Sequence, residues 1–154
     1  MSLAQSHAAT AKPAAAEHPP PRHLLNPAEI LQLLPEIVLV EFETSPTFRV
    51  RYRLTGTQVD ESNGVNLTHA YLDQFDDGHD GSVMAPLIDA YRRAWEKGEA
   101  VIFHYHWKTL RGHVIDVCCG IFPLTIDGTV RQAIAIEEYI IGDVLDRVLP
   151  LRHR

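Results

Sequence analysis

Strict alternation of apolar and polar side chains marks residues 48–55, which read FRVRYRLT. Successive side chains of a strand point to opposite faces, so a period of two predicts an extended segment with one apolar and one polar face. The alternating sets are Phe48, Val50, Tyr52 and Leu54 on one face and Arg49, Arg51 and Arg53 on the other. We expect a half-buried antiparallel strand whose arginines lie in solvent and pair with nearby acids.

Four further segments have the composition of strands. Residues 36–43 precede 48–55 and are joined to them by the turn residues Thr-Ser-Pro, which predicts a hairpin. Three more segments follow later in the chain, at 100–110, 113–124 and 130–140. Arg-Gly and Thr-Ile-Asp-Gly-Thr separate them, and such short linkers with glycine predict hairpins between neighbouring strands.

The clearest helix lies at 82–99, where apolar residues recur at the spacing of one helix face. This stripe consists of Met84, Leu87, Ile88, Tyr91, Ala94 and Trp95. A shorter helix is expected at 27–34, because Asn26 can cap its first turn and Pro35 stops it. The apolar residues of this shorter helix cover more than one face, which predicts contacts with both its own sheet and a second subunit.

The order of these elements predicts an α+β fold. A helical crossover at 57–75 separates the first two strands from the long helix, and a short helix at 142–150 ends the chain. We expect a five-stranded antiparallel sheet with helices on one face. Residues 1–25 are rich in alanine and proline and predict a flexible tail, so 26–149 form a single domain.

Composition excludes several classes of function. The chain has 154 residues, 45% of them hydrophobic, and a formal net charge of −6, which argues against a nucleic-acid partner. No apolar run is long enough to span a membrane, and no secretory leader is evident. Cys118 and Cys119 are adjacent and would face opposite sides of a strand, so we expect free thiols and a cytoplasmic protein.

Candidate catalytic and metal-binding groups are few. His104 and His106 would share one face of a strand, with His113 or Asp116 opposite, which is a pattern that suits zinc or non-haem iron. Alternation with aromatic residues explains the same histidines as the solvated face of a strand, so we predict no metal site. The cysteines lie in a segment typical of a core, and the pair of glutamates at 137–138 is expected to be solvated. We therefore expect no enzyme.

The segment FRVRYRLTGTQVDESNGVNLTHAYLDQF, residues 48–75, resembles a bacterial PAS-like family of unknown role. That family carries a strand of the type F-R-Y-R-L-x-G-T, followed by G-x-x-L-T-G and a leucine-rich helix. The matching residues are Phe48, Tyr52, Arg53, Leu54, Gly56, Thr57, Gly64, Leu67, Thr68 and Leu72. His69 stands where the family has glycine, and the resemblance spans about 26–141.

This resemblance implies a PAS fold, whose sheet meets the helices and in some members encloses a small-molecule pocket. It implies dimers formed through the N-terminal helix or the sheet, and no catalysis. No haem or flavin motif of such domains matches this chain, so the resemblance names no cofactor. We expect the pocket between the crossover and the long helix, with a wall made of Tyr52, Tyr71, Tyr91, Trp95, Phe103 and Tyr105. A slip of one residue in the last strands would place His104 and His106 there instead.

Three hypotheses for function follow. The first is a non-catalytic PAS-type sensory or protein-interaction module, which binds a small molecule between sheet and helices and signals through dimer or partner contacts. The second is a cone-shaped α+β ligand-binding or isomerase-like protein, which needs a buried acid or base supplied by Asp116 or His106. The third is a scaffold that acts through the two-faced helix at 27–34.

Overall fold

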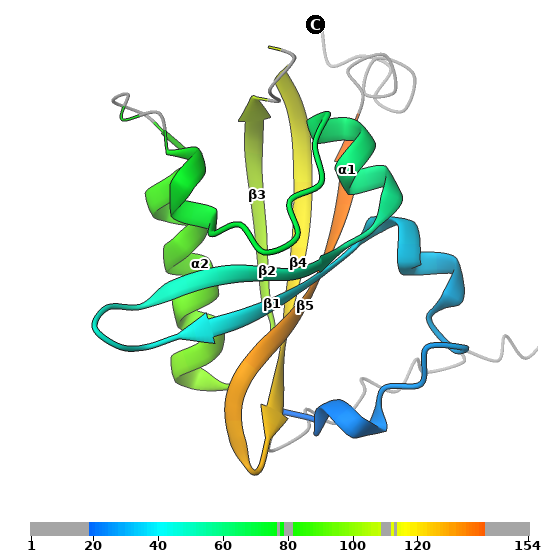
Figure 1. Cartoon of the computed structure of the whole chain (residues 1–154), viewed down its shortest axis with the longest axis vertical. Coiled ribbons are helices and arrows are strands. Elements are labelled where there is room, and N and C mark those ends of the chain that lie inside the picture. Colours follow the sequence, from blue (N-terminus) through cyan, green and yellow to red (C-terminus); the bar gives the residue numbers. More distant parts are fainter. Residues whose placement is uncertain (1–18, 77, 79–81, 109–111, 113, 141–154) are drawn as a thin grey trace, which may run out of the picture.

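Five antiparallel strands form one twisted sheet in the computed structural model, which describes residues 19–76, 78, 82–108, 112 and 114–140. The strands are β1 (Ile37–Glu43), β2 (Arg49–Thr55), β3 (Val101–Lys108), β4 (Val114–Ile126) and β5 (Thr129–Ile140). Their order in the sheet is β2-β1-β5-β4-β3 (Figure 1). The predicted α+β fold with a five-stranded antiparallel sheet is confirmed.

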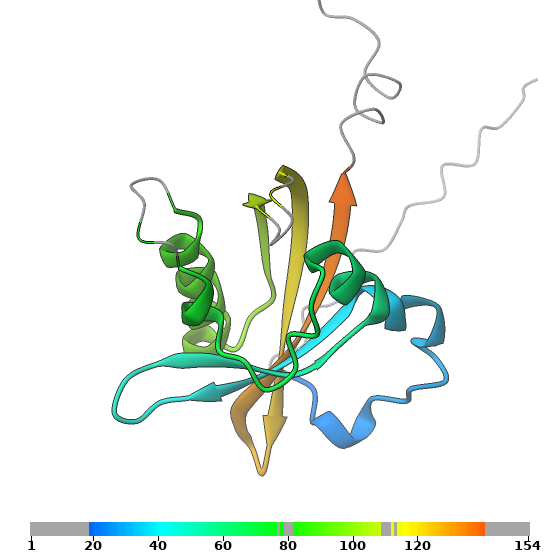
Figure 2. The same ribbon diagram turned by 45° about the horizontal axis from the view of Figure 1, so that its top comes forward.

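Three helical elements cover one side of this sheet, which we call the inner face. They are α1 (Thr57–Asn63), the 3-10 helix η3 (Leu72–Phe75) and α2 (Met84–Lys97). Figure 2 shows α1 and α2 flanking the crossover segment that joins them. The predicted stripe of α2 is largely confirmed, because Met84, Leu87 and Tyr91 are buried in the core. The helix ends at Gly98, whose left-handed backbone suits glycine.

Strand β5 carries small residues on one face and large residues on the other. Ala133 and Ala135 are fully buried on the inner face, where the helices approach closely. Ile134 and Ile136 alternate with them, lie on the outer face of the sheet and are half-buried. Both faces of β5 are therefore covered by other parts of the chain.

One residue of the arginine-rich strand lies on the opposite face from the one its alternation predicts. Tyr52 pairs with Val40 and Leu54 pairs with Leu39, so Arg53 is an extra residue that forms a β-bulge. Beyond the bulge the alternation is reversed. Leu54 consequently lies on the outer face and is 51% exposed.

The segment at 20–36, which we call the strap, covers part of the outer face. It contains two 3-10 helices, η1 (Arg22–Leu24) and η2 (Leu31–Glu36). The predicted α-helix at 27–34 is wrong: Asn26 caps a turn, with its Oδ1 accepting a hydrogen bond from Ala28 N at 3.1 Å. Pro35 lies inside η2 and has no N–H for an α-helical hydrogen bond.

The tail boundary drawn from composition stays a prediction. The residues of that region that the structure describes lie against the sheet, because Thr125 N donates a hydrogen bond to Pro20 O at 3.1 Å. The β4–β5 hairpin turns at Asp127 and Gly128, which both have positive φ angles, as the sequence predicts. The expected helix at 142–150 lies outside the described residues.

Candidate functional site

A buried carboxyl group occupies the inner face of the sheet. Glu137 lies on β5, next to Cys119 of β4, and only 8% of it is exposed. Its Oε1 accepts a hydrogen bond from the Tyr105 hydroxyl at 3.2 Å, and its Oε2 accepts one from the Tyr139 hydroxyl at 2.5 Å. The sheet register brings these groups together, because Val117 of β4 pairs with both Tyr105 and Tyr139.

Burial dominates the electrostatics of this carboxyl group. Loss of solvation raises the pKa of Glu137, and the two tyrosine hydroxyl donors offset only part of that rise. Burial also raises the pKa of Tyr105 and of Cys119, with Glu137 as a further cause in each case. Burial thus shifts the titration of all three groups towards the neutral form.

Little free space lies beside Glu137. The gap measures about 10 Å³, which is roughly what one water molecule needs. Trp107 closes one side of it and donates its indole N–H to Asn63 Oδ1, while Asn63 Nδ2 donates to Val59 O at 2.9 Å. The pocket between sheet and helices is therefore filled by the protein's own side chains, and a larger molecule would have to displace some of them.

Three of the six residues predicted to line a pocket are gathered in this core. Tyr52 and Tyr105 border the gap beside Glu137, and Tyr91 is buried near Cys119. Phe103 stacks on Tyr105 at a ring-centroid distance of 5.7 Å. Trp95 packs on Phe48, with ring centroids 5.2 Å apart, at the edge of the same core and outside the residues that border the gap.

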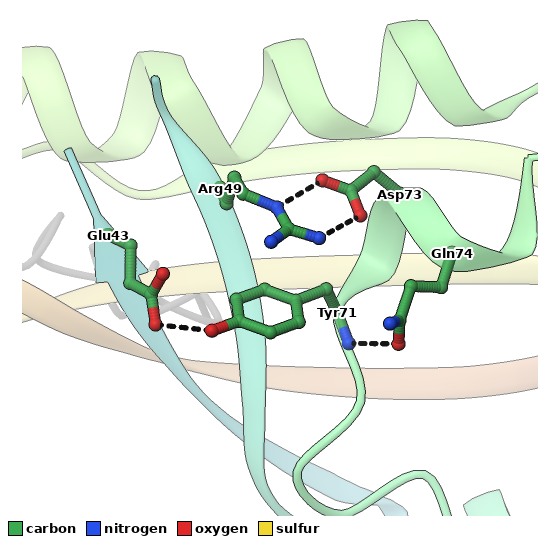
Figure 3. A network of polar contacts seen from close by, with 5 residues as sticks. All are labelled: Glu43, Arg49, Tyr71, Asp73 and Gln74. Atoms are coloured by element: carbon green, nitrogen blue, oxygen red, sulfur yellow. Dashed lines mark hydrogen bonds and ion pairs between the residues drawn. The ribbon is translucent and has the colours of Figure 1, made fainter. Parts of the chain in front are cut away.

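Tyr71 lies on the other side of the sheet from the remaining five. It bridges to Arg51, on the arginine face of β2, and its hydroxyl donates to Glu43 at 2.7 Å (Figure 3). The Arg49 guanidinium lies 3.7 Å from the centre of the Tyr71 ring and binds both carboxylate oxygens of Asp73, each at 2.7 Å. The predicted pairing of the arginine face with acids is confirmed here and for Arg53, 3.5 Å from Glu41.

The histidines of β3 lie on the outer face. His104 and His106 are exposed, and the His106 imidazole lies against the Asp116 carboxyl group. Within the described residues, no group of three or more His, Cys, Asp or Glu side chains is arranged to hold a metal. His113 lies outside the described residues. The Asp116 and His106 that the isomerase-like hypothesis requires therefore do not face the inner pocket.

Glu137 was wrongly predicted to be solvated. Both faces of β5 are apolar in sequence, one with alanines and the other with isoleucines, so alternation alone did not tell which face is the core. The usable signal was the small size of the alanines, which suits the face that helices approach. Once Ala133 and Ala135 are placed inside, Glu137 follows at the next inward position.

Comparison with solved structures identifies the architecture. A light-oxygen-voltage domain studied with a flavin analogue aligns over 79% of this chain and 88% of its own, at 13% identity and a TM-score of 0.58. The light-state blue-light photoreceptor Aureochrome1 LOV gives 13% identity, 80% and 94% coverage and a TM-score of 0.52. A PAS domain from Colwellia psychrerythraea is 9% identical, aligns over 73% of this chain and 95% of its own, and has a TM-score of 0.51. This chain has the PAS fold.

Comparison by sequence does not identify a family for this chain. No protein-family model matches the chain, and no curated protein matches it. The resemblance to the PAS-like motif family thus stays a prediction, while the PAS fold itself is established by the structure. Among the described residues, no helix is both long and apolar enough to cross a membrane.

Proposed function

We propose that this PAS-fold protein is a non-catalytic sensory or protein-interaction module whose signal acts on the inner pocket around Glu137. The observation that carries the proposal is the buried Glu137 carboxyl group, held by two tyrosine hydroxyls in the core of the fold. Burying an ionisable group costs desolvation free energy, and a core needs only packing. The buried carboxyl group therefore supports a functional site.

The size of the gap restricts what this pocket can bind without rearrangement. A volume of about 10 Å³ suits a water molecule or a small polar molecule, and not a flavin or a haem. A larger ligand would have to displace the Trp107 side chain, which closes the gap. Such a displacement would also disturb Asn63 and α1, and it is a route from the pocket to the surface of the domain.

Dimer contacts are the proposed output. The outer face of the sheet exposes large apolar residues, with Ile102 at 67% and Phe122 at 40%. The strap adds Leu31, which is 64% exposed. Burial of these side chains between two copies would remove apolar surface from water. We therefore propose a homodimer through the outer face and the strap.

Native mass spectrometry of the full chain, purified from its own host and compared with a denatured sample, tests this proposal. We expect a dimer, and either a bound small molecule that Glu137→Gln weakens or a bare protein whose dimerisation responds to Glu137→Gln. The control is Glu96→Gln, because Glu96 is exposed on α2, away from both Glu137 and the proposed interface. A monomer without ligand, unaffected by either substitution, would refute the proposal.

Glu137 also gives some support to the isomerase-like alternative. That hypothesis requires a buried acid or base, and Glu137 meets the requirement in place of Asp116 or His106. Burial raises the pKa of the Glu137 carboxyl group, and a raised pKa is a common property of carboxyl groups that act as general acids or bases. Catalytic turnover that is abolished by Glu137→Gln and retained by Glu138→Gln would favour this alternative over the sensory role.

A further inference from the structure

A second and much larger cavity lies on the opposite side of the sheet, between the strap and the outer face. Its volume is about 790 Å³, within the range of about 300–1,000 Å³ typical of small-molecule sites. Figure 1 shows the strap, in blue, running away from the sheet between its two ends. This cavity shares no lining residue with the pocket around Glu137.

Contacts with the sheet hold the strap at both ends. Near its start, Pro20 accepts a hydrogen bond from Thr125 N, and Pro21 forms a bridge with the same residue. Near its end, the backbone of η2 lies against Gly56, so closely that a Cβ there would be 2.3 Å from Leu34 O and Pro35 O. The strap is thus held to the sheet near both of its ends and spans the cavity between them.

The middle of the cavity is lined by aliphatic side chains. The strap contributes Leu25, Ile30 and Leu34, and the sheet contributes Leu39, Leu54 and Ile134. Protein interiors are normally close-packed, and here two aliphatic surfaces face each other without meeting. No Phe, Tyr or Trp is among the lining residues, so the walls suit a flexible hydrocarbon chain better than a flat ring system.

Polar groups gather where the strap meets the β4–β5 hairpin. Arg22 and His23 of the strap line this end of the cavity, facing the hairpin residues Thr125 and Asp127. Within the part of the chain that the structure describes, neither Arg22 nor His23 takes part in an ion pair. The Arg22 guanidinium is the group at this end that can pair with an anion, and the Asp127 carboxylate lines the same end.

We propose that this cavity binds a fatty acid, with the hydrocarbon chain between strap and sheet and the carboxylate at Arg22. The apolar part of such a ligand would cover Leu54, which stays 51% exposed in the structure. The carboxylate would accept hydrogen bonds from the guanidinium group. Binding would join the strap to the sheet along its length and not only at its ends.

Titration of the full chain with dodecanoate tests the proposal, with methyl NMR spectra to locate the binding. We expect saturable binding of one dodecanoate per chain, with shifts of the Leu39, Leu54 and Ile134 methyl groups. The methyl groups of Val117, on the inner face, should not move. Dodecanol, which lacks the carboxylate, should bind more weakly.

Three variants make the test specific. Leu54→Glu should weaken dodecanoate binding about tenfold or more, because it places a charge against the hydrocarbon chain. Val114→Glu is the matched control: Val114 is 68% exposed on β4 and lies outside the cavity, so binding should change by less than about twofold. Arg22→Gln should weaken dodecanoate about fivefold and leave dodecanol unchanged.

Several results would overturn this proposal. They are the absence of saturable binding, equal weakening by Leu54→Glu and Val114→Glu, or shifts confined to Val117 and other inner-face methyl groups. Glu137→Gln should leave dodecanoate affinity unchanged. The fatty-acid proposal and the sensory-pocket proposal can therefore be refuted independently of each other.

Discussion

Glu137 and Glu138 are neighbours in the chain but lie on opposite faces of β5: Glu137 is buried between two tyrosine hydroxyls, and Glu138 is exposed on the outer face. The same substitution at these two adjacent positions therefore compares a buried glutamate with an exposed one.

Glu137→Gln should make the protein more stable relative to wild type as pH rises. The folded-state pKa of Glu137 is raised by burial above the ordinary value of 4.5, so the wild type loses stability as pH rises from 4.5 through the folded pKa. The free energy of unfolding falls by about 1.4 kcal/mol for each unit by which burial raises the pKa of Glu137. Urea denaturation across a pH series measures it, and Glu138→Gln should follow wild type. Parallel curves for Glu137→Gln and wild type would show that Glu137 is not perturbed.

Arg49→Lys should lower the melting temperature by about 2 °C, an effect kept small by solvent screening at this exposed pair. Lysine cannot make both hydrogen bonds to Asp73, nor stack on Tyr71 as the guanidinium does. Arg93→Lys on the exposed side of α2 is the control and should be neutral. The effect should be smaller in an Asp73→Asn background, where only the lost stacking on Tyr71 remains, and an unchanged effect there would contradict the pairing.

The same ion pair predicts behaviour in acid. Arg49 lowers the pKa of Asp73 below its ordinary value of 3.8, so the contribution of the pair is present above 3.8 and is lost as pH falls through the folded pKa. Acid titration of thermal stability should show a smaller loss in Asp73→Asn than in wild type over that window. Equal losses would mean that other carboxylates dominate acid unfolding.

The two cysteines should react with thiol reagents at very different rates. Cys118 is half-buried on the outer face, whereas Cys119 is fully buried and its pKa is raised by burial. Ellman's reagent should therefore modify a single thiol in the native protein. In Cys118→Ser the remaining thiol should react only after denaturant is added, and fast reaction of that variant would refute the assigned faces.

Gly56→Ala should destabilise the protein by about 1–3 kcal/mol. The new methyl group would overlap the carbonyl oxygens of Leu34 and Pro35, which are both backbone atoms. Thr57→Ala, at the exposed first position of α1, is the neighbouring control and should change stability by less than about 0.5 kcal/mol. If both variants unfold at the same denaturant concentration, the strap does not lie against Gly56.

Ile102→Glu should shift a dimer towards the monomer, since it places a charge on the proposed interface. Light scattering after size-exclusion chromatography gives the mass directly. Val65→Glu, at a 39% exposed site after α1, is the control for a surface charge away from the outer face. A dimer that resists Ile102→Glu would place the interface elsewhere.

Periodicity predicted the sheet, the long helix and the fold class, because each depends on the spacing of side chains within one segment. It failed where the outcome depends on contacts between segments. Leu54 was assigned to the core because its strand alternates without a break, and the bulge at Arg53 appears only when β1 is paired with it. Residues 27–34 were predicted to form a helix because Asn26 can cap it and Pro35 can stop it, but Asn26 caps only a turn and Pro35 lies inside a 3-10 helix.

The candidate site was predictable in part. Aromatic residues on the inner face, such as Tyr52 and Tyr105, follow from alternation and from their mixed character. Tyr71 could not be placed, because its face is set by the bridge to Arg51 across an irregular segment. The cavity between the strap and the outer face has no signal in the local sequence, since its walls come from parts of the chain that meet only in the folded molecule.

Strand β5 has alanines on its inner face and isoleucines on its outer face, and it borders both cavities. Glu137 faces one of them, and Ile134 faces the other. An occupant that shifts this strand as it binds on one side must change the affinity on the other side, and thermodynamic linkage makes the two effects equal. If the proposed fatty acid shifts β5 in this way, it would change the affinity of the Glu137 pocket for a ligand, and that ligand would change the affinity for the fatty acid by the same factor.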